Sequence, residues 1–464
     1  MWDRWSAGVA NDMTMRWIVR DKSFYRALIA LAVPICFQNA LTYGVALADN
    51  VMVGQLGETA LGGLYVGTVV HMVLMNILFG VTQGALILTA QYWGARKLEP
   101  LRDIAAMALR AAALVGGAFA AAALLAPEAI ARLVSDKPEV AAVGASYLRT
   151  VGASYLLFAL SQTLLTTLRT VEVVVIGLVN AAVALVLNIV LNWLFIYGHA
   201  GCPAMGVRGA ALATVIARAV ELALVAGYAF VADRTLGFRP RDLARRNPAL
   251  LRDLFRYGTP LMLGQLVWAV NQFGRGFFIG RMAPASIAAA SIADTLDGLV
   301  WMLPLGVAIA CGILTGKTIG EGRFEDMKVQ ARTMQLVFVG IGLLTAAALW
   351  LARPFVLRAY DLAPETLPVA WAFLAVITVT AASRSYQAPS LMGLVKAGGD
   401  TLFVFLNDTF WVFCWVLPGA FIAQRVLHAP DWAVYAMLLS DQVTKCFVAV
   451  VKINRFRWMK RLVA

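Results

Sequence analysis

Long apolar segments are the feature that most constrains what this chain can fold into. The chain has 464 residues, of which 61% are hydrophobic and only 14% are charged, and its mean hydropathy is +0.76. A helix needs about 20 apolar residues to cross a bilayer core, and twelve segments reach that length. Backbone groups in lipid must be satisfied within the spanning segment, so we predict an all-α integral membrane protein. The predicted spans cover residues 24–54, 60–92, 103–126, 140–168, 173–198, 207–232, 255–281, 286–316, 330–352, 366–393, 401–423 and 432–452.

The basic residues gather in alternate connections between these spans. The net charge of +13 is high enough to suggest a nucleic-acid partner. Basic residues that fix the orientation of the chain in the membrane explain their placement in alternate connections better. We therefore predict no nucleic-acid partner, both termini in the cytoplasm, and a multi-pass protein of the cytoplasmic (inner) membrane. The residues that set this bias include Arg96, Lys97, Arg102, Arg234, Arg239, Arg241, Arg245, Arg246, Lys396, Arg457 and Arg461.

One long polar connection divides the predicted spans into six and six. We expect a cytoplasmic tail at 1–23, an N-lobe of six spans at 24–232 and a cytoplasmic linker at 233–254. A C-lobe of six spans follows at 255–452, and residues 453–464 form a second cytoplasmic tail. The two halves have the same number of spans, so they begin on the same side of the membrane.

The two halves also resemble each other in sequence. Pro34 and Pro260 lie 226 residues apart, and at the same offset LILTAQYWGARKLE aligns with GILTGKTIGEGRFE. Asn180 and Asn407 align at an offset of 227. This pattern predicts two pseudo-symmetric six-helix bundles of the parallel repeat type, with a central cleft that opens to either side in turn. We expect Pro34 and Pro260 to act as hinges because a proline inside a helix bends it.

A carboxylate in the first span is the strongest candidate for a functional group. Asp49 lies in an otherwise apolar run, where a charged group costs at least about 2.5 kcal/mol at the bilayer centre. Asn188 and Asn192 are spaced i, i+4 and share one helix face. We predict that these three residues and Thr214 form a site for a proton or a cation. The alternatives are an interfacial position for Asp49 and interhelical hydrogen bonds for the amides.

Further polar residues are candidates for the lining of a substrate cavity. Gln38 and Asn39, which we expect to satisfy the carbonyl freed by Pro34, belong to this set with Tyr43. In the second half, Arg275 takes the repeat position of Asp49, and Asp294 and Asp297 are its predicted ion-pair partners. The alternative is that Arg275 and Arg384 form a positive wall for anionic or zwitterionic cargo. Asp408 and Asp441 are either a relay or part of a water-filled crevice.

The sequence carries no pattern typical of an enzyme. It has no Walker motif, no HExxH and no serine–histidine–aspartate arrangement, and its five cysteines and three histidines are scattered. We therefore predict no catalytic residue, no cofactor, and no metal site beyond a possible Na⁺ at Asp49.

Five motifs together resemble the multidrug and toxic compound extrusion (MATE) family. They are P-I-x-x-Q-N-x(9)-D-N-x-M-V-G-Q-L-G at 34–57, T-A-Q-Y-W-G at the end of the second span, L-N-I-V-L-N-W-L-F-I-Y-G at 187–198, G-V-R-G-A-A-L-A-T at 206–214 and K-A-G-G-D-T at 396–401. The resemblance covers about residues 24–455. It implies twelve helices in two lobes that form a V, and multidrug efflux driven by inward H⁺ or Na⁺.

The resemblance also places individual residues. It puts Asp49, Asn188, Asn192 and Thr214 on the cation-site positions of the family's N-lobe. The NorM-like branch has a Glu in the seventh span and an Asp in the tenth, where this chain has Trp268 and Ser385 or Ala388. The chain therefore looks more DinF-like than NorM-like.

Two function classes fit these observations. The first is a secondary active antiporter, monomeric in the lipid bilayer, that exports small cationic or amphipathic compounds in exchange for H⁺ or Na⁺. The second is a lipid or lipid-linked oligosaccharide flippase of the same wider superfamily. The coupling ion, the identity and charge of the substrate and the physiological role are not encoded in any pattern we find.

Overall fold

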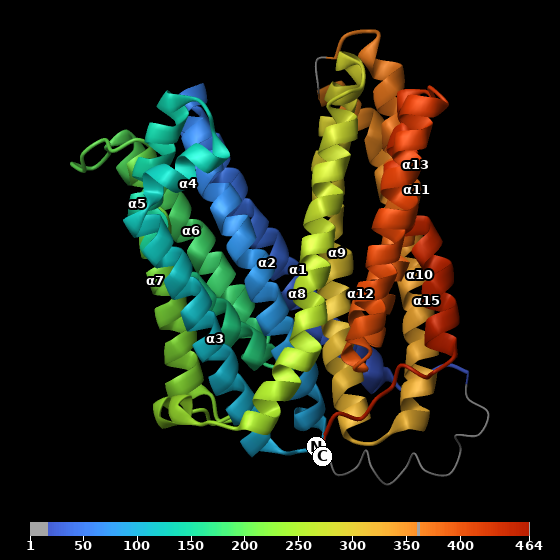
Figure 1. The fold of residues 1–464 in the computed structure, drawn as a ribbon. Helices are drawn as coiled ribbons and strands as arrows, with labels where there is room; N and C mark the ends of the chain where they lie inside the picture. Colours follow the sequence, from blue (N-terminus) through green and yellow to red (C-terminus); the bar gives the residue numbers. More distant parts are fainter. Residues whose placement is uncertain (1–16, 360–361, 464) are drawn as a thin grey trace.

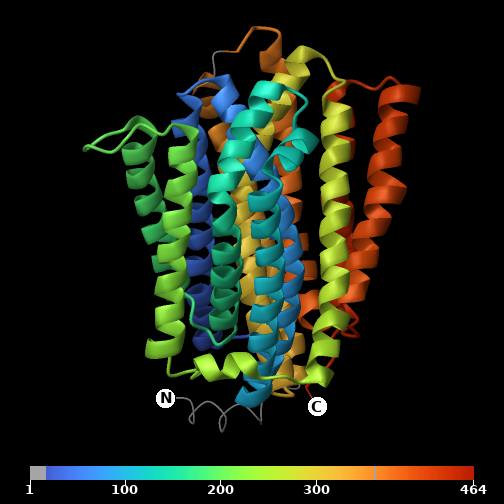
Figure 2. The same ribbon diagram turned by 60° about the vertical axis from the view of Figure 1, so that its left-hand side comes forward.

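The protein forms two bundles of long helices that diverge from a common base, giving a V (Figure 1). The computed structural model describes residues 17–359 and 362–463, and the chain in those ranges is helical with connecting turns. The first bundle, the N-lobe, contains the helices up to α7, and the second, the C-lobe, contains those from α8 onwards (Figures 1 and 2). The last described residues lie at the base, which we call the closed end.

The N-lobe consists of six long helices and a short surface helix. The short helix α4 lies between the third and fourth spans and is not among the predicted elements. The π-helical turn η1 ends the sixth span, and the 3₁₀ turn η2 lies in the linker. The bounds are α1 Lys22–Gly54, α2 Glu58–Gly94, α3 Leu98–Leu125, α4 Pro127–Val134, α5 Pro138–Thr170, α6 Val175–Tyr197, α7 Val207–Gly227, η1 Tyr228–Ala232 and η2 Pro240–Ala244.

The C-lobe has six spans too, but its last three are broken. The tenth is α11 with the π-helical segment η3, the eleventh runs through α12, η4, α13 and η5, and the twelfth is α14 followed by α15. In the tenth and eleventh spans π-helical turns interrupt the regular hydrogen bonding, and in the twelfth a turn at 439–440 separates the two helices. The bounds are α8 Pro248–Ile279, α9 Pro284–Gly320, α10 Phe324–Ala359, α11 Thr366–Ala388, η3 Pro389–Val395, α12 Thr401–Phe410, η4 Trp411–Val416, α13 Leu417–Phe421, η5 Ile422–Val426, α14 Asp431–Leu438 and α15 Asp441–Asn454.

Eleven helical segments of the described chain are long and apolar enough to cross a membrane. The remaining span of the V, α8, has 32 residues but is more polar, because Gln265, Asn271 and Gln272 interrupt its apolar run. Its start is well defined: the side chain of Asn247 accepts a hydrogen bond from the backbone N–H of Leu250, and Pro248 occupies the first turn. The all-α membrane architecture predicted from the sequence is confirmed.

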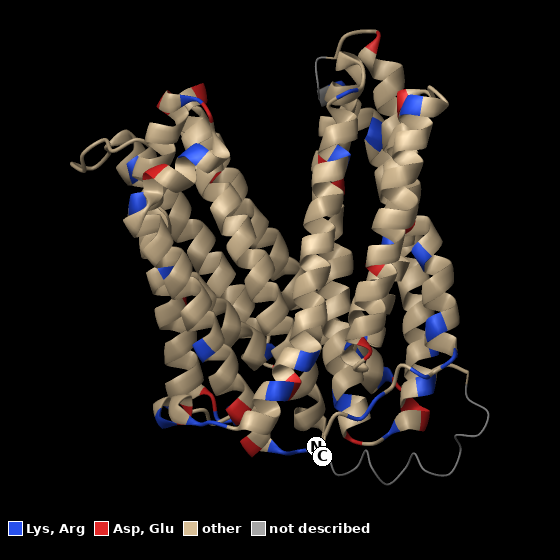
Figure 3. Cartoon of the chain, in the orientation of Figure 1, with Lys and Arg blue, Asp and Glu red and all other residues tan. Residues whose placement is uncertain are grey.

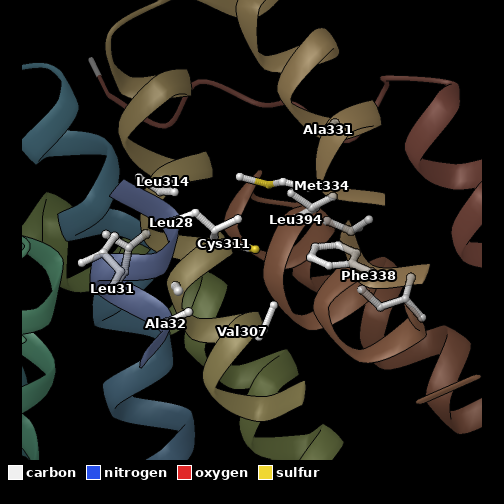
Figure 4. Close-up of a cluster of buried hydrophobic side chains, with 14 of the residues drawn as sticks. Leu28, Leu31, Ala32, Val307, Cys311, Leu314, Ala331, Met334, Phe338 and Leu394 are labelled. Carbon is white, nitrogen blue, oxygen red and sulfur yellow. The ribbon is translucent and has the colours of Figure 1, made fainter. Parts of the chain in front are cut away.

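The first helix of each lobe begins against the opposite lobe. Leu28 and Leu31 of α1 pack in a buried cluster with C-lobe side chains that include Val307 and Phe338 (Figure 4). In the same way Leu254 of α8 packs in a cluster formed by α2, α3 and α5 of the N-lobe. Further along, each helix joins its own lobe.

Pro34 and Pro260 lie at the two crossovers. Pro34 follows the C-lobe contacts of α1 and precedes Asp49, whereas Pro260 follows Leu254 and precedes Phe278, which packs in the C-lobe. Each proline removes one helical hydrogen bond at the point where the helix changes partners. This placement fits the hinge positions predicted for them.

The closed end is held by contacts between the lobes. A Cβ on Gly94 would lie 2.0 Å from the carbonyl oxygen of Lys317, so α2 and α9 can cross there only because this position is glycine. Lys317 also forms an ion pair with Glu172 of the N-lobe. The buried Lys396 donates a hydrogen bond to Gln83 Oε1 at 2.8 Å. These contacts close the base of the V.

The chain after α15 crosses the closed end from one lobe to the other. Trp458 is fully buried in the C-lobe cluster, whereas Val463 packs in the N-lobe cluster. Between them, the Gln91 side chain of α2 donates to the carbonyl of Lys460 at 3.1 Å and accepts from the N–H of Leu462 at 2.8 Å. The segment therefore spans the lobe junction.

Candidate functional site

In the N-lobe the predicted cation site is assembled around Asp49. Asn192 Nδ2 donates a 2.6 Å hydrogen bond to Asp49 Oδ1, and it lies 3.1 Å from Asn188 Oδ1. Both asparagines are buried, Asn188 with an exposed fraction of 1% and Asn192 with 0%, while Asp49 is half-buried. The first and fifth spans therefore meet at a carboxylate that neutral amides surround.

Two atoms of this site lack a hydrogen-bond partner. Asn188 Nδ2 and Asn192 Oδ1 are buried and unpaired, and an unpaired buried polar atom is costly unless a ligand or water satisfies it. The amide and carboxylate oxygens suit a proton shared with Asp49 or a hard cation such as Na⁺. For Na⁺, Asn192 would turn its amide so that Oδ1 faces the ion.

Thr214 lies near the site without touching Asp49. Its hydroxyl donates to the carbonyl of Ala210 in its own helix at 3.0 Å and bonds with the phenol of Tyr147. The charge of Asp49 also acts on that phenol. Thr214 is thus connected to the site through a tyrosine that the sequence analysis did not single out.

A buried ion pair also lies within reach of Asp49. Arg218 NH1 pairs with Glu221 Oε2 at 2.6 Å, and Glu221 is only 4% exposed. The charge of Arg218 acts on Asp49 and on His71. The sequence analysis missed this pair, although two opposite charges spaced i, i+3 inside an apolar span were a usable signal.

The other N-lobe candidates lie closer to the hinge. Gln38 is buried against Gly177 with its Oε1 unpaired, and Tyr43 is exposed, its hydroxyl approaching Gly298 of the C-lobe. The prediction that Asn39 satisfies the carbonyl freed by Pro34 is wrong, because Asn39 Nδ2 has no hydrogen-bond partner. An unpaired donor remains there instead.

The C-lobe holds its charges in ion pairs. Arg275 NH2 lies 2.6 Å from Asp294 Oδ1, which joins α8 to α9 as predicted. Asp297, however, accepts from Arg384 at 2.9 Å and not from Arg275, and so joins α9 to α11. Both arginines are buried, with exposed fractions of 8% and 7%. A carboxylate neutralises each guanidinium, which favours structural ion pairs over the alternative of a positive wall.

A third charged cluster links the eleventh and twelfth spans. Lys445 Nζ lies 2.9 Å from Asp408 Oδ1 and 2.9 Å from Asp441 Oδ2. Gln442 donates to Asp441 at 3.2 Å and accepts from Gln387 at 2.9 Å. The two carboxylates left open by the sequence are thus brought together by a lysine that it did not highlight. We call Asp408, Lys445 and Asp441 the C-lobe triad.

Charged residues of the described chain gather at the ends of the helices, and few lie along their middle parts (Figure 3). In those same residues no group of histidine, cysteine and acidic side chains could hold a metal ion. The polar groups described above are therefore exceptions inside an apolar membrane segment.

Comparisons with known proteins agree with this architecture. The family description MatE matches residues 34–194 and 260–410. The chain is 27% identical over 459 residues to the multidrug resistance protein NorM of Vibrio parahaemolyticus, with 95% of this chain and 97% of the relative covered.

Solved structures match over nearly the whole length. The MATE transporter VcmN of Vibrio cholerae in its bent form matches with a TM-score of 0.83 at 18% identity, covering 94% of this chain and 97% of that one. A MOP superfamily transporter from Pyrococcus furiosus, titled as having a binding pocket of reverse polarity, matches with a TM-score of 0.83 at 20% identity. It covers 93% of this chain and 95% of that one. The family match spans more than half of the residues, and the chain belongs to the MatE family of transporters.

Proposed function

We propose that this protein is a secondary active antiporter that exports small organic compounds, cationic or amphipathic, in exchange for H⁺ or Na⁺. The observation that carries the proposal is the carboxylate of Asp49, which is half-buried and accepts a hydrogen bond from a neutral amide at 2.6 Å. A carboxylate without a fixed cationic partner can exchange one monocation for another. Multidrug efflux by the family, and the name of the NorM relative, support this reading.

The cycle follows from the charge of Asp49. With a bound H⁺ or Na⁺ the site is neutral, and a neutral site costs less inside an apolar membrane segment than a charged one. On the opposite side the ion leaves, and the negative carboxylate attracts a cationic cargo. Because α1 and α8 change lobes at Pro34 and Pro260, bending there would couple the occupancy of the site to the angle of the V.

The orientation and the surroundings are part of the same proposal. We place the closed end, with its basic connections, on the cytoplasmic face of the inner membrane. The V would then diverge toward the outside. We expect a monomer that works without a cofactor and exchanges only the cargo and the coupling ion with its surroundings.

The flippase alternative is not favoured. A lipid phosphate would need an unopposed cation in the cavity, whereas Arg275 and Arg384 are each paired with an aspartate.

The test is transport by the purified chain in proteoliposomes under an imposed pH or Na⁺ gradient. We expect gradient-driven efflux of a cationic dye such as ethidium by the wild type. Asp49→Asn should insert normally and lose this transport, because an amide cannot alternate between charged and neutral forms. A control is Glu128→Gln, an exposed acid that pairs with Arg149 at the surface of the N-lobe. Unchanged efflux by Asp49→Asn would remove this carboxylate from the mechanism.

A further inference from the structure

The C-lobe triad has one negative charge in excess. Among the interior C-lobe charges described above, Arg275 balances Asp294 and Arg384 balances Asp297. The remaining ammonium of Lys445 faces two carboxylates, at 2.9 Å from each. One carboxylate charge therefore has no cation of its own inside an apolar lobe, which is costly unless something neutralises it.

The two carboxylates of the triad are not equivalent. The side chain of Asp441 is only 3% exposed and takes a second donor from Gln442, whereas that of Asp408 is 34% exposed. Lys445 and Asp441 lie i, i+4 on one helix and form a complete ion pair without Asp408. Asp408 is thus the accessible acid that carries the excess charge.

The internal repeat aligns two members of this triad with residues near the N-lobe site. At the offset of 227 that aligns Asn180 with Asn407, Thr214 corresponds to Asp441 and Arg218 corresponds to Lys445. In each lobe, therefore, a basic residue of the last span acts electrostatically on an acid of another span. In the N-lobe that acid is Asp49 on the first span, and in the C-lobe it is Asp408 on the fifth.

The surroundings of Asp408 suit a proton better than a metal ion. A hard cation such as Na⁺ needs several oxygen ligands, but the nearest partner of Asp408 is the ammonium of Lys445, which would repel it. A proton needs only the carboxylate. When Asp408 is protonated, Lys445 keeps Asp441 as its counter-charge and no buried charge is left alone.

We propose that the C-lobe triad is a second proton-exchange site, at which Asp408 takes up and releases a proton while Lys445 serves as the resident cation. Lys445 is shared between the two acids when Asp408 is ionised and belongs to Asp441 when Asp408 is protonated. The inference rests on the proposed transport function. It adds that two carboxylates, one in each lobe, exchange ions during the cycle.

The other charged and titratable groups near the triad come from four elements. They are Arg275 of α8, Asp294 and Asp297 of α9, Arg384 of α11 and Tyr435 of α14. Tyr435 donates to Asp294 at 2.8 Å, and the arginines are paired, so Asp408 is the member free to change its charge.

The test counts the protons exchanged when the purified full chain binds ethidium. Calorimetric titrations at one pH in buffers of different ionisation enthalpy give this number, and repeating them over a range of pH gives its profile. We expect Asp408→Asn to release up to about one proton fewer per bound dye than the wild type. Asp408→Glu should restore the number, and the control Glu128→Gln, an exposed acid on the N-lobe surface, should leave it unchanged.

The remaining outcomes are decisive as well. If Asp408→Asn releases as many protons as the wild type at every pH, the triad is only a structural ion-pair cluster and the inference is wrong. Should Asp408→Asn fold poorly, Lys445→Met gives a second reading: two adjacent carboxylates hold a proton between them, so proton release should rise. No binding of any cationic dye by the folded wild type would contradict the proposed function instead.

Discussion

The two lobes share one fold but differ in the charge that they hold at the repeat position of Asp49. In the N-lobe, Asp49 faces neutral amides, and Asn192 is its closest partner at 2.6 Å. At the repeat position of Asp49 the C-lobe has Arg275, already neutralised by Asp294 at 2.6 Å. A second ion pair, Arg384 with Asp297, joins α11 to α9. The corresponding helices of the N-lobe, α5 and α2, are joined by apolar packing.

This difference suggests that Asp49 exchanges ions, whereas the ion pairs of Arg275 and Arg384 stabilise the fold. An acid held by neutral donors can change its charge without leaving another charge unpaired. In a buried ion pair, neutralising one member leaves the other as an unpaired buried charge. We therefore expect N-lobe substitutions to affect transport and C-lobe pair substitutions to affect stability. The predictions below test this division, beginning with the largest expected effect.

Removing Arg384 should cost the most stability. Arg384→Ala leaves the carboxylate of Asp297 buried, 7% exposed, without its cation, and such a loss costs about 3–5 kcal/mol. We expect a fall of this size in the free energy of unfolding, measured in mixed detergent micelles. The double variant Arg384→Ala/Asp297→Ala should recover part of it. Asp49→Asn, the N-lobe comparison, should unfold at nearly the wild-type free energy. Equal losses in both lobes would break the proposed division.

Removing the donor to Asp49 should weaken cargo binding with little effect on the fold. A hydrogen bond to a charged group contributes about 1.5–3 kcal/mol, so Asn192→Ala should disfavour the ionised carboxylate that a cationic cargo needs. We expect the dissociation constant for ethidium to rise about tenfold or more. Asn188→Ala should have a smaller effect, because that residue acts mainly on Asn192. An affinity unchanged in both variants would show that the amides do not support Asp49.

Much of this contrast could be predicted from the sequence. An isolated acid in an apolar span and two asparagines at i, i+4 pointed to the contact between Asp49 and Asn192, since few other groups were available. The sequence has Arg275 at the repeat position of Asp49, which also predicted that the two lobes differ in their interior charges. The helical membrane fold followed from the length of the apolar segments alone.

Other features depend on packing that a single sequence does not encode. Which aspartate binds Arg275 is decided by the rotation of α9 against α8 and α11, so Asp297 pairs with Arg384 instead. The π-helical breaks in the tenth and eleventh spans also have no local signal that we recognised. Lys445 was overlooked because it lies near the end of the last predicted span, where a basic residue is expected at the membrane surface.

At the closed end, one N-lobe residue contributes directly to the contact between lobes. Glu172 pairs with Lys317, and both side chains are largely buried, at 28% and 14% exposed. Glu172→Lys places two cations together and should favour opening at this end, by about tenfold in the ratio of conformers. Distances between spin labels on the two lobes would report the shift. Glu172→Lys/Lys317→Glu should restore the wild-type distribution, and a distribution unchanged by the single substitution would show that the pair contributes nothing.

The closed end of the C-lobe has its own ion pairs, and these should have the smallest effect. Asp400 lies 2.6 Å from Lys452 and 2.8 Å from Lys460, and the residue at its repeat position in the N-lobe is Val173. Burial alone would raise the pKa of Asp400, but the hydrogen bonds and charges of the two lysines outweigh it and hold the pKa below its usual value.

A carboxyl whose pKa is lowered on folding stabilises the protein above its unfolded pKa of about 3.9, and this contribution is lost as the pH falls through the folded pKa. Since Lys460 is half exposed, the contribution should stay below about 1 kcal/mol. Asp400→Asn should therefore lower the free energy of unfolding slightly at neutral pH, and the difference from the wild type should vanish in acid. The matched N-lobe variant Val173→Asn should show no such pH dependence. A difference between Asp400→Asn and the wild type that persists at the lowest pH would point to packing of the loop, and the contrast between the closed ends of the two lobes would then not be one of charge.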